Sequence, residues 1–133
     1  MISVGMTSET RLTVKDEDTA LAWGSGTLPV LATPRMVLMA EQAAMAAVAG
    51  ELPVGDATVG TLVDIEHVSP SPVGTEVVCR VSVVEVDRAR IRFAVSARDA
   101  SGEVGRGFHE RFVVHSDRFM EKAARKLRRA PRP

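Results

Sequence analysis

The sequence predicts an α+β domain in which a curled, antiparallel, five-stranded sheet surrounds one central apolar helix. Three observations lead to this fold class. The segment from Met36 to Ala49 consists almost entirely of Met, Val, Leu and Ala, which is typical of a helix that is buried on nearly all sides. One strand-like run precedes this helix and four follow it. The four runs are joined by short turns, and short turns connect antiparallel neighbours.

The elements up to the end of the helix have clear start and stop signals. Residues 9–14 form the first expected strand, and an irregular stretch rich in Gly, Ser and Pro follows it. Thr33 and Pro34 predict the start of the helix, with Thr33 as its N-cap and Pro34 at the first helical position. Gly50 suits the C-terminal cap, and Pro53 prevents the helix from continuing.

Four further strands are expected, at residues 58–69, 75–86, 90–98 and 104–115. In the first of these, alternation places five side chains on one face, directed at the helix: Val59, Thr61, Val63, Ile65 and His67. A sheet that curls around an apolar helix in this way is the hotdog arrangement. A single hotdog protomer exposes a sheet edge, so we expect at least a homodimer.

The chain, with 133 residues, is expected to form one domain that spans residues 1–133. Its hydrophobic content of 45% argues against disorder. We expect no membrane partner, because no apolar run has the length or uniformity of a transmembrane helix. With no signal-like segment and with Cys79 as the single cysteine, we expect a cytoplasmic location and a thiol that behaves as a small buried hydrophobe.

Charge is distributed unevenly along a chain whose formal net charge is zero. Residues 117–133 hold seven basic and two acidic side chains, a net charge of +5, which leaves −5 for the rest. We interpret this segment as a basic C-terminal helix or tail, which can attract the phosphates of a cofactor-like substrate. Aromatic residues make up only 4% of the chain, too few for base-stacking platforms, so no nucleic-acid partner is expected.

Three residues are candidates for chemistry, and each has a structural alternative. Glu41 is a carboxylate in an apolar helix, where it must be paired, protonated or chemically active; the structural alternative is an ion pair with Arg35 or Arg111. His67 lies on the apolar face of the next strand, where it can equally be a core histidine bonded to a backbone carbonyl. Thr33 can simply be the helix cap.

Together these residue types suit attack on an acyl carbon. A Glu and a His can activate a water molecule or a hydroxyl group. Gly60 can offer a backbone N–H to a developing oxyanion, or it can mark a bulge or close packing. We predict no metal site, because the three histidines lack the companion ligands of a zinc centre, and we find neither a GxSxG elbow nor a phosphate-binding loop.

Three stretches, ATPRMVLMAE, GTLVDIEHVSPSPVGTEV and SARDASGEVGRGFHERFVV, resemble the fluoroacetyl-CoA thioesterase-like family of hotdog proteins over roughly residues 31–119. The resemblance implies that Thr33, Glu41 and His67 form the catalytic set. It also implies that Gly60, together with Arg111 of the HER sequence, binds the oxyanion or the substrate. The activity that it implies is hydrolysis of a short acyl-CoA thioester near a dimer interface, without a metal or cofactor.

The loop before the helix departs from the family pattern. In the fluoroacetyl-specific enzyme this loop is a lid that carries phenylalanines, whereas residues 21–31 here contain Trp23 and no Phe. We therefore expect thioester hydrolysis but not fluoroacetyl-CoA as the substrate. Two other functions compete with this one: an acyl-CoA hydratase or dehydratase, whose Asp/His helix motif we do not see, and a non-catalytic acyl-CoA-binding or dimerisation module. Direct water attack and an acyl-enzyme intermediate both stay open.

Overall fold

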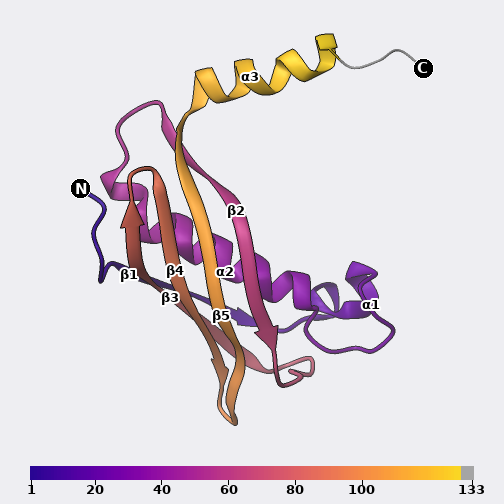
Figure 1. Ribbon diagram of the computed structural model, residues 1–133. Helices are drawn as coiled ribbons and strands as arrows, with labels where there is room; N and C mark the ends of the chain where they lie inside the picture. Colours follow the sequence, from indigo (N-terminus) through magenta and orange to yellow (C-terminus); the bar gives the residue numbers. More distant parts are fainter. Residues whose placement is uncertain (130–133) are drawn as a thin grey trace.

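The structure is a computed structural model that describes residues 1–129. Its elements are β1 (Thr7–Thr13), α1 (Ala20–Trp23), α2 (Thr33–Val48), β2 (Asp56–His67), β3 (Glu76–Asp87), β4 (Arg90–Asp99), β5 (Gly102–His115) and α3 (Ser116–Arg129) (Figure 1). Each strand and the central helix appear where the sequence predicted them. The basic C-terminal segment begins as helix α3, and its last four residues lie outside the described residues.

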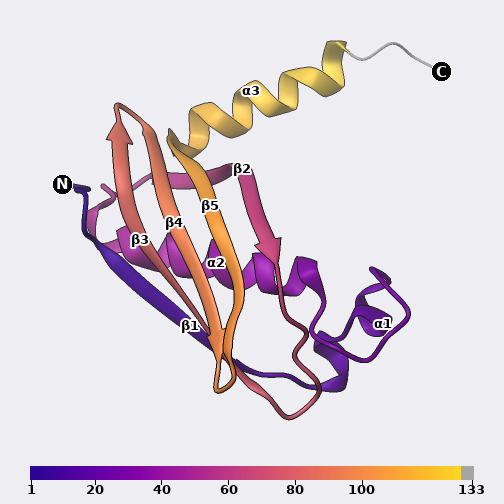
Figure 2. The same cartoon turned by 60° about the horizontal axis from the view of Figure 1, so that its bottom comes forward.

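Within residues 1–129 the five strands form one sheet in the order β1-β3-β4-β5-β2, and every neighbouring pair is antiparallel. The sheet curls around α2, which lies across its concave face (Figures 1 and 2). This confirms the predicted α+β class and the curled sheet around a central helix. Strands β1 and β2 are the two edges, and β2 is the edge that bears the candidate residues.

Helix α2 is buried on one side only, so the expectation of a helix buried on nearly all sides is wrong for the single chain. One face packs on the sheet, through Met36, Met39, Ala40, Ala43, Ala44 and Val48. The opposite face is exposed at Gln42 and Met45, with Met45 43% exposed. The curled sheet reaches around only half of the helix, which leaves apolar helix surface open to solvent.

The ends of α2 also differ from the expected caps. Ala32 is the N-cap and makes no side-chain capping bond, so the helix begins at Thr33, one residue earlier than predicted. The fixed φ of Pro34 suits the second helical position as well as the first, which permits this shift. At the other end Ala49 is the C-cap, and Gly50 lies inside a short 3-10 turn. The hydroxyl of Thr33 is therefore not needed for capping.

The sheet face toward α2 is built from alternating side chains of β3 and β4. The buried members are Val77, Cys79, Val81, Val83, Ile91, Phe93, Val95 and Ala97. Burial raises the pKa of the Cys79 thiol to about 12, so the group stays protonated, as expected for a small buried hydrophobe. Gly105 of β5 lets the helix lie close to the sheet, because a Cβ there would meet Met36 Sδ at 2.6 Å.

Strand β2 contains a bulge that the alternation pattern did not predict. Its pairing with β5 shifts between Gly60 and Leu62. Before the bulge Gly60 lies opposite Arg111, and after it Val63 lies opposite His109. Both partners are buried, so the inward-facing positions of β2 change from even to odd numbers at the bulge.

The predicted inward face of β2 is therefore correct for only half of the strand. Val63, Ile65 and His67 do share the face that carries buried His109. Val59 and Thr61 do not, because the extra residue in the bulge reverses the phase of everything before it. This reversal is what turns Gly60 toward the helix and toward Glu41.

Candidate active site

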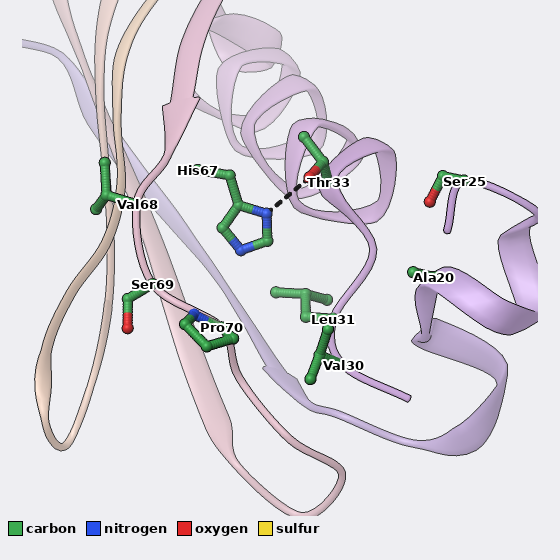
Figure 3. Close-up of a pocket in the computed structure, with 9 residues that line it drawn as sticks. All are labelled: Ala20, Ser25, Val30, Leu31, Thr33, His67, Val68, Ser69 and Pro70. Carbon is green, nitrogen blue, oxygen red and sulfur yellow. Dashed lines mark hydrogen bonds between the residues drawn. The ribbon is translucent and has the colours of Figure 1, made fainter. Parts of the chain in front are cut away.

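Thr33 and His67 meet at the N-terminal end of α2 (Figure 3). The Thr33 Oγ1 atom lies 2.8 Å from His67 Nδ1, the distance of a hydrogen bond. Burial lowers the pKa of His67 below its ordinary value of 6.5, so the ring is neutral at pH 7 and can accept the hydroxyl proton. His67 Nε2 is buried and has no hydrogen-bond partner within residues 1–129. Unpaired buried polar atoms are uncommon, and Arg35 Nη1 is the other one among these residues.

The segment that leads into α2 is held on both sides by hydrogen bonds. Leu31 N–H donates to the Ser71 carbonyl at 2.8 Å, and Ala32 N–H donates to the Asp18 carbonyl at 2.9 Å. The Asp18 carboxylate forms an ion pair with Arg35 Nε at 3.1 Å, in which both side chains are largely buried. These contacts fix the first turn of α2, and with it the hydroxyl that faces His67.

A cavity of about 300 Å³ opens beside the Thr33–His67 pair. Figure 3 shows its walls, which come from α1 and the following loop on one side and from the end of β2 on the other. Its lining consists of Ala20, Ser25, Val30, Leu31, Thr33, His67, Val68, Ser69 and Pro70. None of these nine residues carries a fixed charge, so the cavity suits a neutral group.

Glu41 lies eight residues along α2 from Thr33, and of the two arginines that the sequence offered as its partner, Arg111 is the one that the structure places beside it. Arg111 Nη1 is 3.6 Å from Glu41 Oε2, whereas Arg35 is occupied by Asp18. The Arg111 side chain is 5% exposed and that of Glu41 is 37% exposed. The contact is an ion pair that is too long for a strong hydrogen bond. Glu41 is half-open to solvent rather than buried.

Gly60 stands directly against this carboxylate. A Cβ at Gly60 would lie 3.1 Å from Glu41 Oε2, 3.2 Å from Arg111 Nη1 and 3.3 Å from His109 Cε1. All three distances are tighter than ordinary van der Waals contact, so a side chain here would have to displace one of these groups. Gly60 therefore marks a bulge and a close approach of the backbone, and the same closeness places its backbone beside the candidate carboxylate.

Arg111 is held in a fixed orientation by strand β2. Its Nε donates to Thr58 Oγ1 and its Nη2 donates to the Thr58 carbonyl, both at 2.9 Å. Burial lowers the pKa of Arg111, and the charge of Glu41 acts in the opposite direction. The guanidinium thus stays directed at the bulge, with Nη1 turned toward Glu41.

His109 is a member of this cluster that the sequence analysis considered only as a metal ligand. It is fully buried, and its Nδ1 donates to the Leu62 carbonyl at 2.7 Å. Its Nε2 then accepts from Arg111 Nη1 at 3.2 Å. The spacing of two in His-Glu-Arg places His109 on the same face as Arg111, and this signal could have found it. Within residues 1–129, no group of three His, Cys, Asp or Glu side chains could hold a metal ion.

The predicted site residues form two groups within one chain. Thr33 meets His67, and Glu41 meets Gly60 and Arg111. Thr33 and Glu41 are eight residues apart in α2, about 12 Å along the helix axis. Gly60 and His67 are seven residues apart in β2, about 20 Å along the strand. A single chain does not bring the two groups together.

Comparison with known proteins supports the same assignment. Residues 14–117 match the family described as fluoroacetyl-CoA-specific thioesterase. The fluoroacetyl-CoA thioesterase of Streptantibioticus cattleyicolor is 35% identical over 97 residues, covering 73% of this chain and 70% of that protein. The solved structure of the fluoroacetyl-CoA thioesterase FlK superposes with a TM-score of 0.89 and 28% identity, covering 98% of this chain and 99% of that one.

The fold recurs beyond these relatives. A hot-dog-like protein from Thermanaerovibrio acidaminovorans superposes with a TM-score of 0.87 over 97% of this chain and 94% of its own, at 24% identity. At that identity the likeness confirms the hotdog fold alone. Fold, family match and sequence relative agree, and the chain belongs to the fluoroacetyl-CoA-specific thioesterase family of hotdog-fold enzymes.

Proposed function

We propose that the protein hydrolyses a short-chain acyl-CoA thioester to the free acid and CoA, in a homodimer whose sites each take residues from both subunits. The observation that carries this proposal is that the candidate residues lie in two separate groups within one chain. A hydroxyl bonded to a neutral imidazole stands at one end of β2, and a carboxylate beside a glycine and an arginine stands farther along the same strand. Family membership supports the thioesterase chemistry.

The open edge of β2 supports a shared site. Leu62 is 40% exposed and Val63 is 49% exposed on this edge strand, and apolar residues of this kind favour pairing with another chain. Two identical strands related by a two-fold axis pair antiparallel. A pairing centred near Val63 sets Gly60 of one subunit opposite His67 of the other. Glu41, Gly60 and Arg111 of one subunit would then face Thr33 and His67 of the second.

In such a site each group has a chemical role. The neutral His67 accepts the proton of the Thr33 hydroxyl, and the Glu41 carboxylate accepts a proton from water. The Gly60 N–H and the Arg111 guanidinium stabilise the oxygen that becomes negative during attack on the thioester carbonyl. Two routes fit these roles: water attacks the carbonyl directly, or Thr33 does so first and water then releases the acid. Mass spectrometry of the protein quenched during turnover distinguishes them, because only the second route adds the acyl mass to Thr33.

The cavity beside Thr33 and His67 supports an uncharged acyl group. Its lining combines small and apolar side chains with Ser25 and Ser69, and it lacks the bulk of an aromatic lid. A carboxylated acyl group, such as malonyl, would be desolvated there without a cation. We also propose a cytoplasmic location, which cell fractionation tests; within residues 1–129 no helix is long and apolar enough to span a bilayer.

A hydrolysis screen across acyl-CoA esters tests the proposal. Release of free thiol is measured for acetyl, fluoroacetyl, butyryl, hexanoyl and malonyl esters, with the wild type and with Glu41→Gln. We expect turnover of neutral short-chain esters, little turnover of malonyl-CoA, and a loss of about 100-fold or more in Glu41→Gln while its dimer persists in gel filtration. Retention of more than about a tenth of the activity would exclude Glu41 as a base. Release of thiol from none of the esters would favour the binding module.

A further inference from the structure

The basic C-terminal segment has no role in the candidate site described above. Its described part is helix α3, which leaves the end of β5 and extends past the edge strand β2 in both views (Figures 1 and 2). A hollow of about 400 Å³ lies where this helix meets the strand. The residues that line it are Val114, His115, Arg118, Phe119 and Lys122. The hollow therefore joins the first turns of α3 to the end of β5, the strand that also carries Arg111.

The hollow is positively charged. Arg118 and Lys122 are four residues apart on α3, so they share the helix face that turns toward the hollow. The two acidic residues of α3, Asp117 and Glu121, are not among its walls, and Glu121 pairs with Arg125 at 3.3 Å. Within residues 1–129 neither Arg118 nor Lys122 takes part in an ion pair. Two cations around a hollow without a carboxylate favour an anion that carries more than one charge.

Phe119 gives the same hollow an aromatic wall and is 40% exposed. An exposed aromatic ring can stack with a nucleobase of any identity. An arginine binds phosphate oxygens through parallel N–H groups, and a lysine binds them as a point charge. An aromatic ring beside an arginine and a lysine therefore suits a phosphorylated nucleoside.

The hollow lies at a distance from Arg111 that matches the length of the flexible arm of CoA. His115 is four residues beyond Arg111 in β5, about 13 Å along the strand. The pantetheine arm has about as many chain bonds as four residues of extended polypeptide, which gives it a reach of about 13 Å. When the thioester carbonyl lies at Gly60 and Arg111, the arm can therefore place the diphosphate and the adenosine at the base of α3.

We propose that this hollow binds the phosphorylated adenosine end of CoA. Arg118 and Lys122 pair with the phosphates, and Phe119 stacks with the adenine. The inference rests on the proposed thioester hydrolysis and deepens it, because it assigns the recognition of the coenzyme to the subunit that supplies Arg111. The three side chains hold the substrate far from the reacting bond, so they should act on KM rather than on kcat.

Binding of CoA and of adenosine 3′,5′-bisphosphate tests the site without turnover. Isothermal titration calorimetry on the full-length protein compares the double variant Arg118→Gln with Lys122→Gln and a control double variant, Arg128→Gln with Arg129→Gln. Both double variants lose the same charge from the same helix, but Arg128 lies ten residues beyond Arg118, about 15 Å along the axis.

We expect the first double variant to raise the dissociation constant of either probe about tenfold or more, and the control to change it less than about threefold. Equal effects of the two double variants overturn the site, because they would show attraction by net charge alone. A wild-type protein that binds neither probe overturns it as well.

Truncated substrates test the site during turnover. An acyl-pantetheine has the thioester and the arm of the acyl-CoA but lacks the adenosine. We expect the Arg118→Gln and Lys122→Gln double variant to raise KM about tenfold for the acyl-CoA and not for the acyl-pantetheine. Phe119→Leu, which removes the ring and keeps an apolar side chain, should raise KM about threefold or more for the acyl-CoA alone. A KM that rises equally for both substrates overturns the assignment.

Failure of this site and failure of the proposed hydrolysis give different results. Probe binding that depends on Arg118 and Lys122, without hydrolysis of any ester, refutes the proposed function and leaves the coenzyme site intact. Hydrolysis with KM values that ignore Arg118, Lys122 and Phe119 refutes the site alone. Binding to anionic phosphatidylserine vesicles that is lost in the double variant, with a wild-type KM for acyl-CoA, assigns the two cations to a membrane surface and also overturns the site.

Discussion

His109 connects the bulge of β2 to the Arg111 guanidinium through two hydrogen bonds. It accepts from Arg111 and donates to the carbonyl of Leu62, the residue that follows the bulge. The imidazole is therefore fixed in one tautomer, with its hydrogen on Nδ1. Burial lowers the pKa of His109, and the charge of Arg111 beside it acts in the same direction, so the ring stays neutral and remains an acceptor for the guanidinium.

Two substitutions separate the two bonds of His109. In His109→Gln the amide oxygen can occupy the Nε2 position and still accept from Arg111, while the Leu62 carbonyl loses its donor. In His109→Asn the amide can still donate to Leu62, while Arg111 loses its acceptor. Each variant leaves one buried polar group unpaired, so both should lose about 1–3 kcal/mol of stability in thermal unfolding.

The turnover numbers of these variants should differ. Because Arg111 must stay directed at Glu41, we expect kcat in His109→Asn to fall about tenfold below that in His109→Gln, with thioester hydrolysis as the measurement. Equal turnover in the two variants would mean that His109 contributes packing alone and does not position Arg111.

The lowered pKa of His67 predicts how the activity depends on pH. The neutral ring is the form that accepts a proton, so kcat/KM should be constant at neutral pH and should fall as the pH drops through the pKa of His67. Because burial lowers that pKa, the midpoint of the fall lies below pH 6.5. A titration of the His67 ring by NMR should give the same midpoint, and a midpoint at or above 6.5 would contradict the assignment.

Among the elements, β2 does most to shape the candidate site, because its bulge decides which residues face the helix. Gly60 lies at this point, with Glu41, Arg111 and His109 packed around the space a Cβ would take. Arg111 and His109 are buried, and each makes at least two hydrogen bonds, so their side chains cannot move easily. The more exposed Glu41 is the group that would be displaced.

We therefore expect Gly60→Ala to reduce kcat about tenfold or more while the unfolding temperature changes little. Turnover and thermal unfolding measured together test this. Thr61→Ala, one residue further along and exposed, is the control and should keep its activity. A Gly60→Ala variant with wild-type turnover would show that the position of Glu41 relative to the strand is not critical.

The elements of this chain were predictable from sequence. The exact ends of α2 were not, and neither was the set of β2 side chains that face the helix. Alternation and turn residues located all five strands and the helix within residues 1–129. The bulge at Gly60 is not visible in alternation, because a single extra residue shifts the pattern without changing its composition. Likewise Thr33 before Pro34 fits a cap and a first helical residue equally well, and only the backbone of the folded chain, with Ala32 as the N-cap, shows that Thr33 is the first helical residue.

The candidate site was predictable as a set of residues and not as a geometry. Thr33, Glu41, His67, Gly60 and Arg111 came from residue chemistry and family resemblance. Which of them lie together depends on long-range pairing: Arg35 is taken by Asp18, which leaves Arg111 as the cation near Glu41. Nothing in the local sequence chooses between these two arginines.

On the scale of the whole molecule, the single chain has the surfaces of an incomplete assembly. Apolar groups lie in solvent at three places: the open edge of β2, the exposed face of α2, and the Phe119 and Leu127 side chains of α3. The two groups of candidate residues are also separated by about 12 Å along the helix. A second subunit would cover the first two of these surfaces and join the two groups in one site.

Mixed dimers test this arrangement directly. Thr33→Ala and Glu41→Gln protomers are combined after each homodimer has been shown to be inactive. If each site takes Thr33 from one subunit and Glu41 from the other, the heterodimer contains one intact site and one doubly altered site. It should then recover about half of the wild-type activity per dimer. A heterodimer as inactive as both parents would place the two residues in the same subunit's site.

The burial of Cys79 has a practical consequence for all of these measurements. The chain has one cysteine, and its thiol is fully buried with a pKa raised to about 12. The native protein therefore does not react with thiol-reactive chromophores, so colour that develops during an assay comes from released CoA. For the same reason a cysteine engineered on α3 or on the outer sheet face could be labelled with a spin probe or dye while Cys79 is left in place. Distances between subunits can then be measured on an otherwise unaltered core.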